Sequence, residues 1–219
     1  MNLELIKARS QIVKLVRRWF DEQGFLEMHT PRLVGLPGQE PYLEPMWSEV
    51  TEANGTKHPA ALITSPEYAM KKMLAAGLDK IYDLGPCFRD GEPWDGSHDP
   101  EFLMLEWYRR DAGLKELFQD TENLVRFVGQ EWCSPEQRPA WLDQSFRCIT
   151  VKEAMKQYAN IDLGVVLENR EALVEVVRAH GQTVQPTDTW DDLFFKVFLS
   201  EVEPNLGWKD PSHTIEQPT

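Results

Sequence analysis

The sequence of 219 residues predicts an α+β fold in which helices flank a mainly antiparallel sheet of six or seven strands. Segments with helical spacing and segments typical of strands alternate irregularly along the chain, without the regular strand–helix repeat of parallel folds. Two expected strands, 80–89 and 101–110, are separated by a turn that is too long for a tight hairpin. The composition, 42% apolar and 27% charged, is that of a globular protein with a substantial core.

The first expected element is a helix from about Leu3 to Glu22, followed by Gly24 where a helix C-cap belongs. Residues 25–31 are then typical of a strand that Pro31 closes. The helix carries apolar residues at helical spacing, namely Ile12, Leu15, Val16, Trp19 and Phe20. This stripe either packs on the chain's own sheet or forms a contact between two copies of the chain.

The next elements are short strands and loops in the proline-rich residues 35–60, and then a strand from Ala60 to Thr64. Ser65 and Pro66 are suited to the start of a helix that runs to Ala76, with Ser65 as its N-cap. The expected strands 80–89 and 101–110 follow, and residues 90–100 form the long turn between them.

The second half of the sequence predicts helices. Leu114 to Glu131 has clear helical periodicity, residues 134–147 form a linker rich in Pro, Gln and Ser, and Val151 to Gly181 is typical of a small helical subdomain. A last helix is expected from Trp190 to Glu201. We therefore divide the chain into a sheet-containing core at 1–133, a linker and helical insertion at 134–189, and a return helix with its continuation at 190–219.

Charge and cysteine content restrict the functional classes. The formal net charge of −13 argues against a large RNA ligand and favours a small molecule or a basic protein partner. The three cysteines form no CxxC pair and no disulfide framework, which indicates a reducing cytoplasm. No apolar stretch approaches the length of a membrane helix, and no signal-peptide pattern is present.

The strand at 101–108 is the most informative segment, because successive side chains of a strand point to opposite faces. One face is apolar and the other is mixed: Leu103, Leu105 and Trp107 against Phe102, Met104, Glu106 and Tyr108. A carboxylate and a phenol in mid-strand are costly to bury without partners. The mixed face is therefore either the floor of a pocket that receives a cation, or a solvated sheet face.

Arg89 ends the preceding strand, beside a glycine-containing loop. A guanidinium fixed at a strand end suits bidentate contact with phosphate oxygens. Glu92 and His98 lie on the same loop, within reach of a folded triphosphate. Each of these residues taken alone is more typical of surface charge, so only their combination indicates a nucleotide site.

Three blocks of sequence resemble class II aminoacyl-tRNA synthetases. Residues 87–92 with 98–109 resemble motif 2, in the version found in lysyl-tRNA synthetases and in their short relatives that lysylate elongation factor P. Residues 24–31 resemble motif 1, which forms the dimer interface in that family, and 64–72 are similar to its amino-acid-binding loop and helix. The blocks occur in the family's order and spacing, which implies a class II catalytic core and a homodimer.

The resemblance implies an ATP site with Mg²⁺ bridging the phosphates. Arg89 would be the catalytic residue that holds the α-phosphate, Phe102 would stack on adenine, and His98 would approach the β- and γ-phosphates. Glu92 would lie near the adenine or the loop backbone. Asp99 stands where the family usually has Asn, and its added negative charge beside a triphosphate predicts weaker ATP binding.

The resemblance also implies a site for a lysine-like amino acid. Ser65 and Glu67 would receive its α- or β-amino group, and Glu106 with Tyr108 would hold the side-chain ammonium. No protein residue is assigned as a metal ligand.

Two further departures concern the length of the chain. The loop between Arg89 and His98 is one residue longer than expected, and motif 3, a Gly-rich strand and helix with a second phosphate-binding Arg, is absent. Residues 203–207 resemble a point about two-thirds through the short relatives. We therefore expect a chain truncated at its C-terminus, whose 219 residues alone support little or no catalysis.

Three functions remain open. The chain begins at the motif 1 helix, without the anticodon-binding barrel of a lysyl-tRNA synthetase, and is acidic, which favours a cytoplasmic ligase that transfers lysine or β-lysine to elongation factor P. The alternatives are a fragment of a lysyl-tRNA synthetase catalytic domain and a non-catalytic paralogue that binds an amino acid. Under the first of these functions tRNA is not a partner and no membrane is involved.

Overall fold

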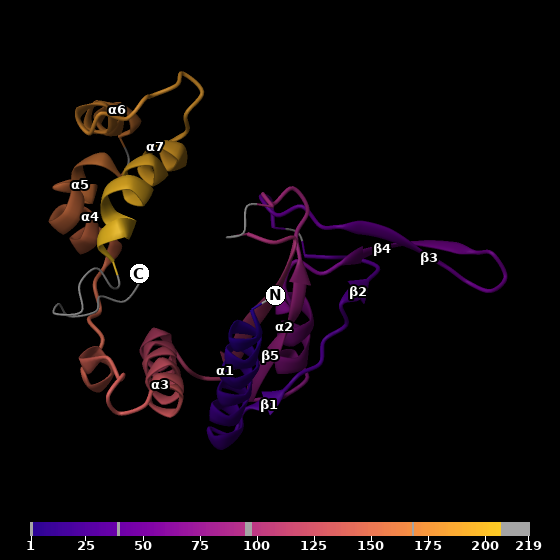
Figure 1. Cartoon of the computed structure of the whole chain (residues 1–219). Coiled ribbons are helices and arrows are strands. Elements are labelled where there is room, and N and C mark those ends of the chain that lie inside the picture. Colours follow the sequence, from indigo (N-terminus) through magenta and orange to yellow (C-terminus); the bar gives the residue numbers. More distant parts are fainter. Residues whose placement is uncertain (1, 39, 95–97, 168, 207–219) are drawn as a thin grey trace. The chain divides into compact units, whose positions relative to one another are not determined.

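The computed structural model describes residues 2–38, 40–94, 98–167 and 169–206 (Figure 1). The chain divides into two compact units, residues 1–132 and 133–219, and each has a hydrophobic core of its own. The expected extra residue between Arg89 and His98 falls on a loop whose residues 95–97 lie outside the described part. The same holds for 207–219, the end of the expected third segment.

The first unit contains helices and strands in the order that the sequence predicts. They are α1 (Leu3–Glu22), β1 (Leu26–Glu27), β2 (Leu33–Val34), β3 (Trp47–Thr51), β4 (Lys57–Leu62), α2 (Glu67–Ala75), β5 (Lys80–Phe88), β6 (Glu101–Arg109) and α3 (Leu114–Trp132). The Asn2 side chain caps α1 by accepting from the backbone N–H groups of Glu4 and Leu5. Gly24 adopts φ of 75°, the left-handed conformation expected just beyond a helix end.

The strands form two sheets, and the expectation of one sheet of six or seven strands is wrong for the described residues. One sheet has the order β1-β5-β6, the other β2-β4-β3, and every pairing is antiparallel except that of β1 with β5. The segment around Pro31 lies between them without a ladder of its own. Beyond it β3 and β4 continue as a hairpin (Figure 1), and every residue of β3 is exposed. A fully exposed strand such as β3 carries no apolar alternation, so the sequence did not indicate a separate sheet.

The core of the first unit lies between α1, α3 and one face of the β5–β6 pair. Phe20 is fully buried and stacks on Tyr82 with ring centroids 4.5 Å apart, and Trp19, Phe25 and Leu124 complete the buried set. Leu84, Leu105 and Trp107 pack against the same cluster. This core fixes one face of β5 and β6, and helix α2 packs on the same two strands.

The second unit is helical. Its helices are α4 (Val151–Ala159), α5 (Leu163–Val166), α6 (Arg170–Ala179) and α7 (Trp190–Val197), preceded by a short 3₁₀ helix at Ala140–Asp143. The expected helix to Glu201 is α-helical to Val197 and continues as a π-helix, Phe198–Val202. Leu193 and Val197 of α7 share one buried cluster with Leu173 and Val177 of α6, so α7 belongs to the helical unit and not to a separate segment. Among the described helices, none has the combination of length and apolarity that crossing a membrane demands.

Candidate functional site

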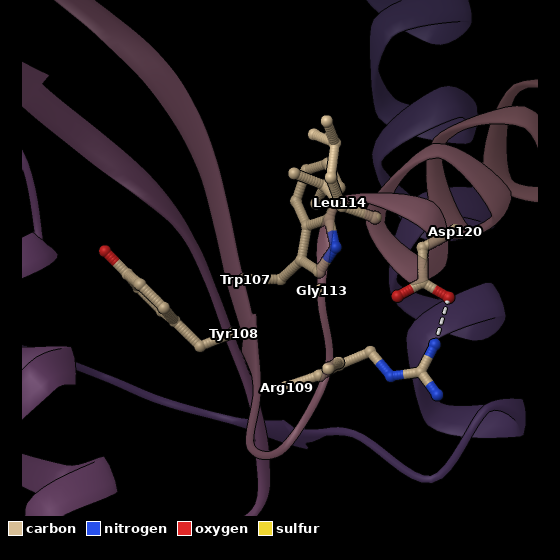
Figure 2. A pocket seen from close by; sticks show the side chains of 8 residues that line it. Trp107, Tyr108, Arg109, Gly113, Leu114 and Asp120 are labelled. Carbon is tan, nitrogen blue, oxygen red and sulfur yellow. Dashed lines mark hydrogen bonds and ion pairs between the residues drawn. The ribbon is translucent and has the colours of Figure 1, made fainter.

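The β5–β6 pair separates an apolar face from a functional one. The antiparallel register places Asp83 opposite Glu106 and Cys87 opposite Phe102. Because Leu84, Leu105 and Trp107 pack into the core, residues of the opposite parity lie on the other face, which we call the site face. Figure 2 shows the alternation directly: the side chains of Trp107 and Tyr108 leave β6 on opposite sides. The predicted division of residues 102–108 into two faces is confirmed.

A cavity of about 220 Å³ lies at the end of the site face, where the long loop joins the two strands. It is lined by the five residues for which the sequence predicts a nucleotide site: Arg89, Glu92, His98, Asp99 and Phe102. His98 and Asp99 are exposed, whereas Arg89, Glu92 and Phe102 are partly buried. Glu106 and Tyr108 do not line this cavity, but lie farther along the same face.

Arg89 is held at the mouth of this cavity by both its backbone and its side chain. Its backbone N–H donates to the Pro100 carbonyl at 3.0 Å, which closes the ladder beyond Phe88. Its guanidinium carbon lies 5.0 Å from the centroid of the Phe102 ring, in cation–π geometry. The Nε–H is buried without a hydrogen-bond partner in the described part of the chain. An unsatisfied buried donor on a cationic group is suited to an anionic acceptor.

The position of Arg89 also modifies the role expected for Phe102. The sequence led us to expect an open aromatic face for adenine, but the guanidinium of Arg89 lies over that ring. A base that stacks on Phe102 must therefore either use the opposite side of the ring or displace Arg89 toward the phosphates.

Glu106 and Tyr108 form a pair farther along the face, in which the Tyr108 hydroxyl donates to Glu106 Oε1. Burial raises the pKa of Glu106, the hydrogen bond from Tyr108 lowers it, and the carboxylates of Glu67 and Asp83 raise it further. Burial, together with the neighbouring Glu106 carboxylate, also raises the pKa of Tyr108. Since no described residue forms a salt bridge with Glu106, the pair is a site that a cation would stabilise.

The start of α2 contributes the remaining expected residues. Ser65 Oγ accepts from the backbone N–H of Glu67 at 3.3 Å, although Pro66 and not Ser65 is the N-cap. The Glu67 carboxylate forms an ion pair with Lys71 one turn later. Helix α2 packs on β5 and β6, and the charges of Glu67 and Lys71 both act on Glu106. Glu67 is thus paired directly with Lys71, whereas Glu106 feels the charge of Lys71 only at a distance and forms no salt bridge with a described residue.

Sequence reasoning missed a buried ion pair on the site face. The Arg32 Nη2 atom donates to Asp83 Oδ1 at 2.5 Å, and Arg32 Nη1 donates to Thr30 Oγ1 at 3.1 Å. Asp83 Oδ2 accepts from the Thr30 backbone N–H and hydroxyl at 3.0 and 2.9 Å. The signal for it was present, because a carboxylate in the otherwise apolar strand 81–88 requires partners. The identity of those partners, 51 and 53 residues away, is not encoded locally.

A second cavity, of about 380 Å³, lies on the core side of β6, between that strand and the start of α3 (Figure 2). Leu114, Leu117 and Trp107 make it largely apolar. Asp120 pairs with Arg109 through Oδ1 at 2.8 Å, while its Oδ2 and the Trp107 indole N–H are buried without partners in the described chain. This cavity shares no lining residue with the nucleotide pocket, so the two are distinct.

Within the described residues, no group of three or more His, Cys, Asp or Glu side chains is arranged to hold a metal ion. Glu92 and Asp99 are the carboxylates that line the nucleotide pocket. Two carboxylates fit a magnesium ion that reaches the site already bound to phosphate oxygens, because Mg²⁺ in phosphate sites commonly has one or two protein carboxylates together with substrate oxygens.

Comparison with known proteins places these features in context. Residues 2–211 match the family model for class II (D, K and N) tRNA synthetases. The chain is 33% identical over 215 residues to a lysine–tRNA ligase of Mesomycoplasma hyopneumoniae (strain 7448), covering 94% of this chain and 42% of that protein. It is 30% identical over 216 residues to an "elongation factor P–(R)-beta-lysine ligase homolog" of Aquifex aeolicus (99% and 68% covered). It is 29% identical over 211 residues to an "elongation factor P–(R)-beta-lysine ligase" of Actinobacillus succinogenes (96% and 61% covered).

Proposed function

Because this chain belongs to the family of class II (D, K and N) tRNA synthetases, we propose that it contributes the ATP- and amino-acid-binding face of an enzyme that activates the carboxylate of lysine or β-lysine. The observation that carries the proposal is that one sheet face holds two polar groups whose natural partners are missing from the described residues. In the described residues, Arg89 has a buried donor without an acceptor, and Glu106 has a carboxylate without a salt bridge. A lysyl adenylate provides a phosphate for the first and an ammonium for the second.

The activation step joins the substrate carboxylate to the α-phosphorus of ATP. A carboxylate oxygen attacks that phosphorus, the bond from it to the bridging oxygen of the β-phosphate breaks, and pyrophosphate leaves. Arg89 would contact the α-phosphate oxygens, where negative charge develops as the bond forms. His98, exposed at the pocket rim, would reach the β- and γ-phosphates, and Glu92 would lie beside the base. Bound Mg²⁺ would supply neutralisation of the phosphate charge.

The substrate's side chain would lie along the strand toward Glu106. Its ammonium would form the ion pair with Glu106 that no described residue forms. The Tyr108 hydroxyl would hold the Glu106 carboxylate in place by its hydrogen bond. Ser65 and Glu67, at the start of α2, would receive the α- or β-amino group. Since Glu67 is already paired with Lys71, we expect it to contribute less to affinity than Glu106.

For the second step we propose transfer to a lysine side chain of elongation factor P. The amine nitrogen attacks the carbonyl carbon of the adenylate, the bond to the phosphate oxygen breaks, AMP leaves and the amine loses a proton. The net charge of −13 favours a basic segment of a protein over a tRNA backbone. The three cysteines are unpaired, which is compatible with action in the cytoplasm.

A lysine–tRNA ligase activity is the second candidate, supported by the 33% identity to the Mesomycoplasma protein. It shares the activation step and differs only in the acceptor. The chain spans 42% of that relative's length and 61% and 68% of the two named for elongation factor P, so the acceptor has to be determined by experiment.

The acceptor can be identified by following labelled substrate. We expect the full-length gene product, given ATP and radiolabelled lysine or (R)-β-lysine, to label elongation factor P and to leave tRNA unlabelled. A factor whose acceptor lysine is replaced by arginine is the matched control and should remain unlabelled. Label that appears in tRNA and not in the factor would replace this proposal with the synthetase function.

A further inference from the structure

The Arg32–Asp83 ion pair lies on the site face between the two subsites described above. Asp83 is opposite Glu106, Gly85 is opposite Met104 and Cys87 is opposite Phe102. The Arg32 guanidinium covers Gly85, because a Cβ atom on Gly85 would lie only 2.7 Å from Arg32 Cζ. With about 3.3 Å per residue along a strand, the guanidinium is roughly 7 Å from the Glu106 pair on one side and from the Phe102 pair on the other.

The ion pair is oriented with its positive end toward the site. The Asp83 side chain is fully buried and its two oxygens accept three hydrogen bonds, whereas 23% of the Arg32 side chain is exposed. A guanidinium has five N–H donors, of which Asp83 and Thr30 use two. The other three have no partner in the described part of the chain. The outer edge of Arg32 thus offers planar donors that match a carboxylate.

Gly85 is required for this arrangement. The position is buried by the guanidinium that lies on it, so any side chain there would push Arg32 away from Asp83 and out over the site. Asp83 and Gly85, both in β5, together hold the distant Arg32 guanidinium at one point of the face. A salt bridge that served stability alone would not need its cation to lie partly exposed on this face.

We propose that Arg32 binds the substrate's carboxylate group and so sets the substrate class as amino acids with a distal ammonium, to the exclusion of simple diamines. This inference rests on the proposed function, because it uses the ammonium subsite at Glu106. The spacing along the strand fits a lysine-like molecule, with its ammonium at Glu106, its aliphatic chain running from Glu106 toward Met104, and its carboxylate at Arg32, beside the nucleotide pocket. Arg32 is a binding residue for the carboxylate before it reacts with ATP.

The test compares the binding of L-lysine with that of cadaverine, which has the same chain and a distal ammonium but no carboxylate. We expect the full-length protein to bind lysine more tightly than cadaverine by calorimetry. In Arg32→Gln/Asp83→Asn, a neutral pair that leaves no buried charge, lysine affinity should fall about 10- to 100-fold relative to cadaverine affinity. Arg110→Gln/Asp79→Asn, the same double change at an exposed ion pair, is the matched control and should alter neither affinity.

Two single variants keep the test decisive should the double variant fail to fold. Arg32→Lys retains a charge for Asp83 but loses the planar fork, and Gly85→Ala displaces the guanidinium. Both should lower the ratio of lysine to cadaverine affinity. A ratio that stays constant while both affinities fall would assign Arg32 a structural role and overturn the inference. A parent protein that binds neither compound would overturn the proposed function itself, and this inference with it.

Discussion

Glu106 lies partly buried on the site face, with the Tyr108 hydroxyl as its hydrogen-bond donor. Burial raises the pKa of its carboxyl, and no salt bridge to a described residue offsets that cost. In the free protein this residue is therefore held at the expense of stability, which is common where a protein is built to bind a ligand. Under the proposed function, an ammonium bound at this carboxylate would offset that cost.

We expect Glu106→Gln to weaken lysine binding about 10- to 100-fold, because a charge-assisted contact is lost. The affinity of the parent for lysine should fall as the pH drops through the raised pKa of Glu106, since lysine stays cationic and only the carboxylate titrates. The variant should lose this pH dependence. Calorimetric titrations between pH 4 and 8 measure both effects, with the exposed Glu101→Gln as control.

The same substitution should stabilise the free protein at neutral pH. A carboxyl whose folded pKa is raised adds stability below its unfolded pKa and loses it as the pH rises through the folded pKa. Replacing it with Gln should therefore raise the free energy of unfolding at pH 7, by up to about 1 kcal/mol, and have no such effect in acid. Urea denaturation that shows destabilisation at pH 7 would contradict the interpretation of Glu106 as an unpaired charge.

At the scale of single residues, the sequence predicted which side chains share a face better than it predicted their partners. Strict alternation identified Phe102, Glu106 and Tyr108 together, because a strand allows only two faces. It did not predict Arg32 beside Asp83, or Arg89 over Phe102. The first contact depends on how segments about 50 residues apart in the sequence come together in three dimensions. The second depends on how the residues at the facing ends of two paired strands are placed.

Helix α1 shows the same distinction at the scale of an element. Its bounds, Leu3–Glu22, were predicted from periodicity and from Gly24. The apolar residues of the helix, however, differ in their burial. Trp19 and Phe20 are buried in the first unit's own core, which counts against their use between two copies, whereas Ile6 and Ile12 are exposed. We propose that any homodimer uses the N-terminal half of the helix.

The dimer proposal predicts that Ile6→Asp/Ile12→Asp converts a dimer to a monomer, since both charges would enter the interface. Sedimentation velocity at micromolar concentration measures the change. Leu199→Asp, an exposed apolar residue of the helical unit, is the control and should leave the dimer intact. A parent protein that sediments as a monomer would remove the dimer from the account.

The sheets could not be predicted equally well. β5 and β6 were recognised because one face of each is packed against α1 and α3 and is therefore apolar. β3 was expected only as one of the short strands within residues 35–60, because all of its residues are exposed and no apolar alternation marks where it begins and ends. For that reason the sequence led us to expect one sheet where the structure has two. The two sheets are also divided at Pro31, because the segment between β1 and β2 forms no strand pairing.

At the scale of the whole molecule, the chain consists of two units with separate cores, of which the first carries the proposed site. The second unit supplies none of the residues assigned to ATP or amino acid. Family membership was accessible from sequence because three motifs keep their order and spacing, a property of the chain that needs no coordinates. The orientation of the side chains within the pocket was not accessible from the sequence.

The most direct test of the central claim is exchange of labelled pyrophosphate into ATP by the full-length gene product, which reports adenylate formation before any acceptor is involved. We predict exchange that requires lysine or β-lysine, and a loss of about 10²–10³ in rate in Arg89→Ala, because a positioned donor to the developing phosphate charge is removed. Arg110→Ala, an exposed arginine at the opposite end of β6, should retain the parent's rate. Exchange that occurs without any amino acid, or an Arg89→Ala variant as active as the parent, would contradict the account.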